Sequence, residues 1–123
     1  MPSARSTLRF ARYFVELVQS AADEYSLIVE IIAQTEKAVK IRLKISEHFF
    51  VQFYNHSQSK TSNYVLIGWN RRLYGRDSVG GVWHRHPYDN PSNHDFSEEG
   101  SREITPSEFL EEVFEILSLE GLI

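Results

Sequence analysis

The stretch Ala38–Ile45, AVKIRLKI, decides the fold more clearly than any other part of the chain. Apolar residues alternate there with three cationic residues, Lys40, Arg42 and Lys44. A period of two residues is typical of a β-strand with one buried face and one face turned to solvent. The cationic face could follow a phosphate backbone, or it could be an ordinary solvated surface that protects a sheet edge.

Other strands are predicted on both sides of this one. Upstream, Ser26–Ala33 is rich in β-branched residues, and we expect a largely buried strand. Downstream, Phe49–Tyr54 and Asn63–Trp69 are predicted to be strands joined by a polar loop, and Leu73–Asp77 could add a further short strand. Consecutive strands with short connections indicate an antiparallel sheet.

Both ends of the chain have helical patterns. Apolar residues recur at helical spacing through Leu8–Ala21, which predicts an amphipathic helix of about 15 residues. Near the C-terminus, Thr105 is expected to cap a helix, with Pro106 in the first position and Glu108 completing a capping box. Residues 1–123 are therefore predicted to form one α+β domain: an antiparallel meander sheet of roughly four to six strands, with the N-terminal and C-terminal helices packed on one face.

Composition excludes several classes of protein. The chain of 123 residues has a size typical of one domain and contains no cysteine. Disulfides, cysteine-based zinc knuckles and thiol nucleophiles are therefore excluded. No run of about 18 apolar residues and no signal-peptide pattern is present, so we expect a cytoplasmic protein.

The formal net charge of −4 conceals an uneven distribution. Residues 37–85 contain nine basic residues against two acidic ones, whereas residues 86–123 contain one basic residue against ten acidic ones. The basic middle could face phosphate, and the acidic end could fold over it or meet a basic partner. Both segments could equally be solvated surfaces.

The segment 74–96, YGRDSVGGVWHRHPYDNPSNHDF, contains three of the five histidines and is the predicted site. In an extended backbone His84 and His86 point to the same side, with Arg85 opposite. Two imidazoles can serve as general acid and general base, because unperturbed histidine titrates near pH 6.5. Such a pair suits metal-independent cleavage of RNA through attack by the 2′-hydroxyl.

Charged neighbours would assist this reaction. Arg76 or Arg85 could stabilise the charged phosphorane, and Arg85 is also a candidate contact for substrate. Asp77 or Asp95 could orient an imidazole. The predicted catalytic residues are His84, His86, Arg76 and Asp77.

Substrate contacts are expected from aromatic and basic side chains. Trp83 and Tyr88 could stack on bases, while Lys40, Arg42 and Lys44 could hold phosphates. The same aromatic residues would equally suit a non-enzymatic domain that docks to a protein partner.

The histidines also allow a metal-binding alternative. His84, His86 and His94 could coordinate a divalent metal through neutral ring nitrogens. The spacing is similar to that of cupin metal sites, but Ser78 stands where a cupin has glycine, and Asn90 and Pro91 occupy the place of its acid. A third alternative is that the histidines only cap loops.

The strand with alternating charges, the aromatic hairpin, YGRDSVGG at residues 74–81, the His-Arg-His at 84–86 and the amphipathic C-terminal segment together resemble the TumE-type toxin family. These are small prokaryotic proteins usually found beside a helix-turn-helix antitoxin. The chain departs from the family pattern by lacking an aromatic residue between Arg76 and Asp77, by having Ser78 where asparagine is usual, and by having residues 79–81 in place of paired histidines. The resemblance implies the toxin of a type II toxin–antitoxin pair, with a cognate antitoxin as partner. Independently of the resemblance, the chain could form a homodimer.

Overall fold

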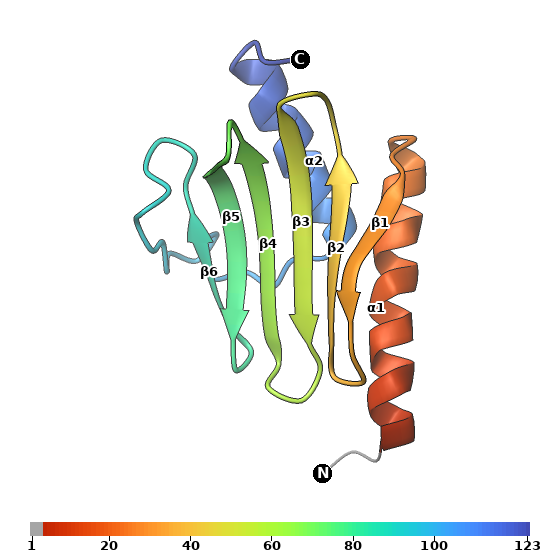
Figure 1. The fold of residues 1–123 in the computed structure, drawn as a ribbon. Helices are drawn as coiled ribbons and strands as arrows, with labels where there is room; N and C mark the ends of the chain where they lie inside the picture. The colour runs from red at the N-terminus through yellow and green to blue at the C-terminus, as the bar shows by residue number, and fades with distance from the viewer. Residues whose placement is uncertain (1–3) are drawn as a thin grey trace.

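The computed structural model of the protein describes the backbone of residues 4–123 and the side chains of residues 12–123. Its elements are α1 (Ala4–Glu24), β1 (Val29–Gln34), β2 (Ala38–Lys44), β3 (Phe49–His56), β4 (Thr61–Gly68), β5 (Arg71–Val79), β6 (Val82–His86) and α2 (Pro106–Leu119). The strands form one six-stranded antiparallel sheet in chain order, β1 to β6. Both helices lie behind this sheet in Figure 1, α1 beside β1 and β2 and α2 behind the central strands. The predicted α+β meander is thus confirmed.

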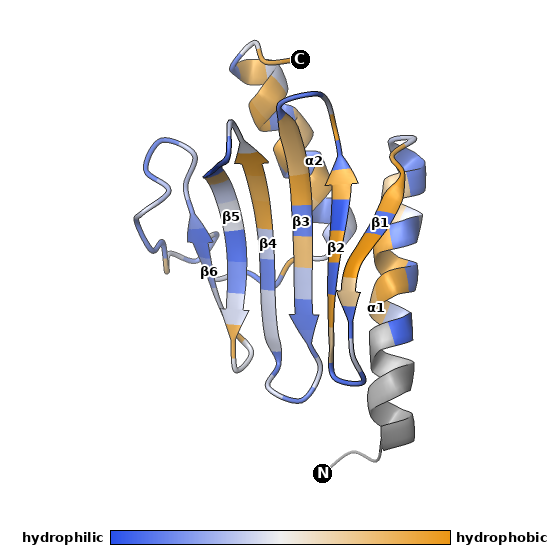
Figure 2. Cartoon of the chain, viewed as in Figure 1, coloured by the Kyte–Doolittle hydropathy of each residue, from blue (hydrophilic) through white to orange (hydrophobic). Residues whose placement is uncertain are grey.

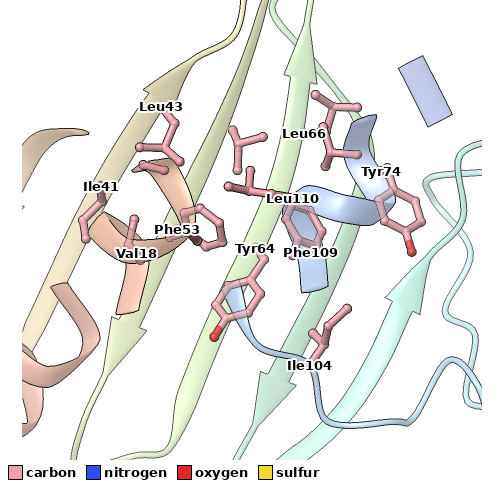
Figure 3. Packing of buried hydrophobic residues seen from close by; sticks show 14 of the residues in the cluster. Val18, Ile41, Leu43, Phe53, Tyr64, Leu66, Tyr74, Ile104, Phe109 and Leu110 are labelled. Carbon is pink, nitrogen blue, oxygen red and sulfur yellow. The ribbon is translucent and has the colours of Figure 1, made fainter. Parts of the chain in front are cut away.

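The alternation in β2 separates the two faces of the sheet. Val39, Ile41 and Leu43 are each at most 1% exposed and face the helices. Figure 3 shows Phe109 and Leu110 of α2 and Val18 of α1 packed against this side of the sheet. We call it the helix-covered face, and we call the opposite side, which carries the cations of β2, the open face.

The sequence predicted where α2 begins more closely than it predicted the length of α1. Helix α1 spans 21 residues, longer than expected, and buries Phe14, Val18 and Ala21. The side chains of Leu8 and Phe10, also expected on its apolar face, lie outside the described residues. Helix α2 begins as predicted: the backbone N–H of Glu108 donates to Thr105 Oγ1, and the backbone N–H of Thr105 donates to the Glu108 carboxylate. Among the described helices, none is long and apolar enough to cross a membrane.

Strand β1 corrects one prediction. Ser26–Ala33 was expected to be largely buried, but β1 is an edge strand whose Ile31 and Ile32 are 47% and 40% exposed. It pairs only with β2, and its register shifts between Ile31 and Ala33, so neighbours cover it incompletely. Its hydrophobic residues stand out at the edge of the sheet in Figure 2.

A tight hairpin joins β5 to β6 and builds the region of interest. Gly80 and Gly81 form its two-residue turn with φ values of +61° and +89°, which glycine adopts without the strain other residues would meet. Val79 pairs with Val82 to close the turn. The short strand predicted at Leu73–Asp77 is therefore part of a longer one. His84 and His86 lie on the strand that pairs with it, whereas His94 lies in the loop that follows.

Candidate metal-binding site

The register of the β5–β6 hairpin brings one carboxylate and two imidazoles together. Asp77 lies directly opposite His84, and Gly75 lies opposite His86. Because directly opposed residues and residues two apart share a face, Asp77, His84 and His86 all project from the open face. Sequence reasoning predicted that the two histidines share a side, and the strand places them so.

Three atoms of these side chains converge. The Nε2 atoms of His84 and His86 are 3.1 Å apart, and Oδ2 of Asp77 lies 3.1 Å from His86 Nε2 and 3.7 Å from His84 Nε2. The other nitrogen of His86, Nδ1, is 2.9 Å from the carbonyl oxygen of Pro91. A carbonyl only accepts hydrogen bonds, so Nδ1 is the donor and Nε2 of neutral His86 carries a lone pair toward the cluster.

His94 completes the group from a neighbouring loop. Its ligand atom lies within 4.8 Å of those of His84 and His86, and its ring is more exposed than theirs. The loop folds back because Asp95 pairs with Arg85 through two backbone hydrogen bonds of 2.8 and 3.0 Å. This bridge beside β6 sets the position of His94 next to the hairpin histidines.

The distances fit the ligand shell of a small transition metal. In tetrahedral zinc sites the ligand nitrogens lie about 2.05 Å from the metal, which places neighbouring ligand atoms about 3.3 Å from one another. The three separations among Asp77, His84 and His86 are 3.1, 3.1 and 3.7 Å. These three residues could therefore form part of the shell of one metal ion. His94, whose ligand atom lies within 4.8 Å of those of His84 and His86, would have to move closer to complete it.

The electrostatics of His84 also suit metal binding. Its side chain is almost buried, and this burial is the main cause that lowers its pKa below the usual value. The Asp77 carboxylate opposes the shift, while His86, His94 and Arg72 add to it. A lowered pKa keeps the imidazole neutral, which is the form that coordinates metals.

Arg76, predicted to be catalytic, lies elsewhere. It is fully buried on the helix-covered face, where Nε and Nη2 donate to the two carboxylate oxygens of Glu112 at 3.1 and 2.6 Å. Its Nη1 donates to the carbonyl oxygen of Glu99 at 2.7 Å. Arg76 thus ties β5 to α2 and to the loop before α2, and the structure does not bring it to the histidines.

Arg85 and Asp95 form a second pair away from the cluster. Nε and Nη2 of Arg85 donate to Oδ2 of Asp95 at 2.9 and 2.6 Å. Hydrogen bonds from Ser97 and then from Arg85 lower the pKa of Asp95 to about 2. Of the two carboxylates expected to orient an imidazole, Asp77 is the one that reaches the histidines.

The aromatic residues expected to stack on substrate are also separate from the histidines. Trp83 is 9% exposed and packs edge-on against Tyr64 on the helix-covered face. Tyr88 is half-buried and lines a groove with Arg85 and Glu112. Neither side chain is brought to the open face beside the imidazoles.

The cations of β2, Lys40, Arg42 and Lys44, which the sequence analysis expected to hold phosphates of a substrate, lie on the same face of the sheet as the cluster. Two further neighbours were missed: Asn63, whose Nδ2 donates to Oδ1 of Asp77 at 2.7 Å, and Arg72, whose Nη1 lies 3.8 Å from Asp77 Oδ2. Pairing β4 with β5 in the antiparallel register would have placed Asn63 opposite Asp77.

No protein-family model, no curated protein and no solved structure matches the chain. The resemblance to TumE-type toxins therefore stays a prediction. The geometry of the site is what indicates its chemistry.

Proposed function

We propose that this protein binds one divalent transition metal ion, of the zinc class, through His84, His86, Asp77 and His94. The observation that carries the proposal is the convergence of two imidazole nitrogens and a carboxylate oxygen at 3.1, 3.1 and 3.7 Å. Imidazole and carboxylate ligands without thiolates suit zinc, and they also suit iron, nickel or copper. The Pro91 carbonyl, by fixing the tautomer of His86, supplies the second-sphere contact typical of metal-bound histidine.

The same distances favour a metal over a metal-independent acid–base pair. A general acid and a general base that cleave a phosphodiester must each reach a different oxygen, on opposite sides of phosphorus, at about 2.6–3.2 Å. The Nε2 atoms of His84 and His86 are 3.1 Å from each other, which leaves no room for a phosphate between them. The metal-independent ribonuclease would need the two rings to separate first.

A metal in this position would support hydrolysis. A zinc-type ion held by three of these residues, with the fourth position left to water or substrate, can polarise a phosphoryl oxygen and lower the pKa of a bound water to about 7. With all four residues as ligands, the ion would need a fifth position to do the same. His94 is the most exposed of the candidate ligands, so its side is the one from which water or substrate would approach. Asp77, hydrogen-bonded to Asn63, and His86, fixed by Pro91, would keep the remaining ligands in place.

Metal content tests the proposal directly. The full-length protein is stripped with EDTA, incubated with Zn²⁺ or Co²⁺, desalted and analysed for metal. We expect one metal per chain in the parent protein and none in a His84→Ala, His86→Ala double variant. The matched control, His48→Ala with His56→Ala, removes two imidazoles that lie outside the cluster and should keep the metal. Equal metal content in both double variants would overturn the proposal.

A ribonuclease is the second candidate function, supported by the three cations of β2 on the face that carries the histidines. Total RNA is incubated with the parent protein and with the His84→Ala, His86→Ala variant, with and without EDTA. Cleavage that both EDTA and the substitutions abolish would support a metal-dependent nuclease. Cleavage that survives EDTA would support the histidine pair alone, and intact RNA throughout would remove the nuclease.

The toxin proposal comes from the resemblance to TumE-type proteins and has its own test. A cytoplasmic toxin should arrest growth when expressed alone in bacteria, and co-expression of a neighbouring helix-turn-helix protein should restore growth. A stable complex with that neighbour, without toxicity of the chain alone, would instead support a non-enzymatic interaction domain. Size-exclusion chromatography of the same samples would report whether the chain is a homodimer.

A further inference from the structure

The open face is crossed by a row of side chains that ends at the metal-binding cluster. Because each strand pairs in register with the next, residues from five strands line up across the sheet. From β2 to β6 this first row consists of Lys40, Tyr54, Asn63, Asp77 and His84. Strands lie about 4.8 Å apart, so the row is roughly 19 Å long.

Two further rows run beside the first. From β2 to β6 the second row consists of Arg42, Gln52, Val65, Gly75 and His86. The third row consists of Lys44, Phe50, Ile67 and Arg72. Every row therefore begins with a cation on β2, and two of the three continue with an aromatic ring on β3.

The charges on this face are mainly positive. Lys40, Arg42, Lys44 and Arg72 face only two acids in these rows and their extension into β1: Asp77, which belongs to the metal cluster, and Glu30, which lies opposite Arg42 at the sheet edge. A polyanion that crosses the sheet would meet three cations and one acid at the β2 end and, at the other end, a single carboxylate, Asp77, with the guanidinium of Arg72 3.8 Å away.

Arg42 has an unmet donor at the start of this path. Among the described residues, its Nε is a buried side-chain nitrogen with no hydrogen-bond partner. Its guanidinium carbon lies 4.2 Å above the centre of the Phe50 ring, and Nη2 makes only a 3.4 Å bond to Gln52. Because Nε itself is buried, a phosphate would reach Arg42 through the end nitrogens of its guanidinium, which the Phe50 ring holds in place.

We propose that single-stranded nucleic acid lies across the open face, along the rows from β2 to β6. Lys40, Arg42 and Lys44 contact its phosphates, and the partly exposed rings of Tyr54 and Phe50 stack on its bases. A sheet face with exposed aromatic rings selects single strands, because the faces of bases in a duplex are already stacked. The strand would then present a phosphodiester to the metal cluster, and only this last part rests on the proposed function.

Anisotropy of a labelled oligonucleotide of about 12 nucleotides tests this in EDTA, with no metal present. RNA, single-stranded DNA and duplex DNA are compared over a range of salt concentrations. The open-face variant carries Lys40→Gln, Arg42→Gln and Lys44→Gln. The control variant carries Lys37→Gln, Lys60→Gln and Arg71→Gln. It removes the same amount of positive charge, but from exposed turns and one strand end.

We expect single strands to bind more tightly than duplex. The open-face variant should lose at least about tenfold in affinity, and its plot of log affinity against log salt should be shallower by about 2. The control variant should change far less. Tyr54→Ala should weaken binding by about tenfold, whereas Tyr54→Phe, which keeps the ring, should bind like the parent. Comparing the affinity for RNA with the affinity for single-stranded DNA shows which of the two nucleic acids the open face prefers.

Equal losses in the open-face and control variants, or duplex binding as tight as single-strand binding, would overturn the inference. Metal analysis of the same samples separates the two proposals. A parent that holds one metal but shows no face-dependent binding contradicts the strand proposal alone. A parent that binds single strands through these residues but holds no metal contradicts the metal centre alone and supports the strand proposal.

Discussion

Arg76 and Asp77 are neighbours on β5, yet they belong to two different regions. Arg76 points to the helix-covered face, where the carboxylate of Glu112 and the carbonyl of Glu99 accept its hydrogen bonds. Asp77 points to the open face, where its Oδ2 lies 3.1 Å from Nε2 of His86. Because the Pro91 carbonyl takes the Nδ1 proton of neutral His86, two acceptors, Oδ2 of Asp77 and Nε2 of His86, face each other there. A satisfied ion pair stabilises the fold, whereas acceptors that converge without enough donors are suited to a cation.

The largest effect expected from this comparison is on stability. Arg76→Met should lower the free energy of unfolding by about 3–5 kcal/mol, because it leaves the Glu112 carboxylate without the partner that neutralises it. Urea titration monitored by circular dichroism in EDTA measures this loss. Metal affinity of the protein that remains folded should stay near that of the parent.

The control for Arg76 is another arginine with acidic partners. Arg102→Met removes exposed ion pairs to Glu99 and Glu108 and should cost about 1 kcal/mol or less. If the two arginine variants lost equal stability, the buried network would not have the structural role assigned to it.

Asp77→Asn should lower metal affinity with little effect on stability, the opposite of what is expected for Arg76→Met. Its amide can still accept the hydrogen bond from Asn63 but is a poor metal ligand, so zinc affinity should fall by at least about 100-fold while stability in EDTA changes little. Competition with a chromophoric chelator measures the affinity. Asp89→Asn, an exposed acid in the following loop, should bind zinc like the parent; parental affinity in Asp77→Asn would speak against the metal centre.

At Arg72 we expect a smaller change in zinc affinity, and an increase rather than a decrease. Its guanidinium lies 3.8 Å from Oδ2 of Asp77 and would repel a metal ion there. Arg72→Gln should therefore raise zinc affinity by about fivefold, the effect of roughly 1 kcal/mol between exposed charges at this distance. The same competition assay measures it, with Arg71→Gln as the control. An unchanged or lower affinity in Arg72→Gln would contradict the proposed position of the metal.

The smallest effect concerns the loop between β6 and α2, which contributes His94 to one region and Glu99 to the other. The pKa of Asp95 is about 2 in the fold against 3.8 for the free side chain. A lowered carboxylate pKa stabilises the fold above about pH 4, and this contribution is lost as the pH falls from about 4 to 2. Asp95→Asn should therefore show a smaller drop in melting temperature over that interval than the parent. An equal drop would mean that the contacts of Asp95 with Ser97 and Arg85 do not hold the loop.

Local patterns in the sequence were enough for much of the fold. The alternation of Ala38–Lys44 and the capping box at Thr105 depend on residues at most a few positions apart, and both appear as predicted. The β5–β6 hairpin has a local signal, Gly80-Gly81, a pair that favours a two-residue turn. Burial of β1 could not be judged locally, because it depends on its place at the sheet edge.

The site was only partly predictable, because its members meet through long-range pairing. The shared side of His84 and His86 follows from a period of two. Arg76 was assigned to the same site as a cation for the charged phosphorane, but strand alternation sends it to the opposite face, where its partner Glu112 lies 36 residues further along the chain. The contact of Asn63 with Asp77 requires the β4–β5 register, which no local pattern specifies.

X-ray absorption spectroscopy of the zinc-loaded full-length protein is the most direct test of the metal centre. We predict nitrogen and oxygen ligands at about 2.0–2.1 Å from the zinc, with outer-shell scattering from at least two imidazoles. That imidazole scattering should be lost in the His84→Ala, His86→Ala variant. A spectrum of solvent oxygens without imidazole scattering, or one that the two substitutions leave unchanged, would contradict the central claim.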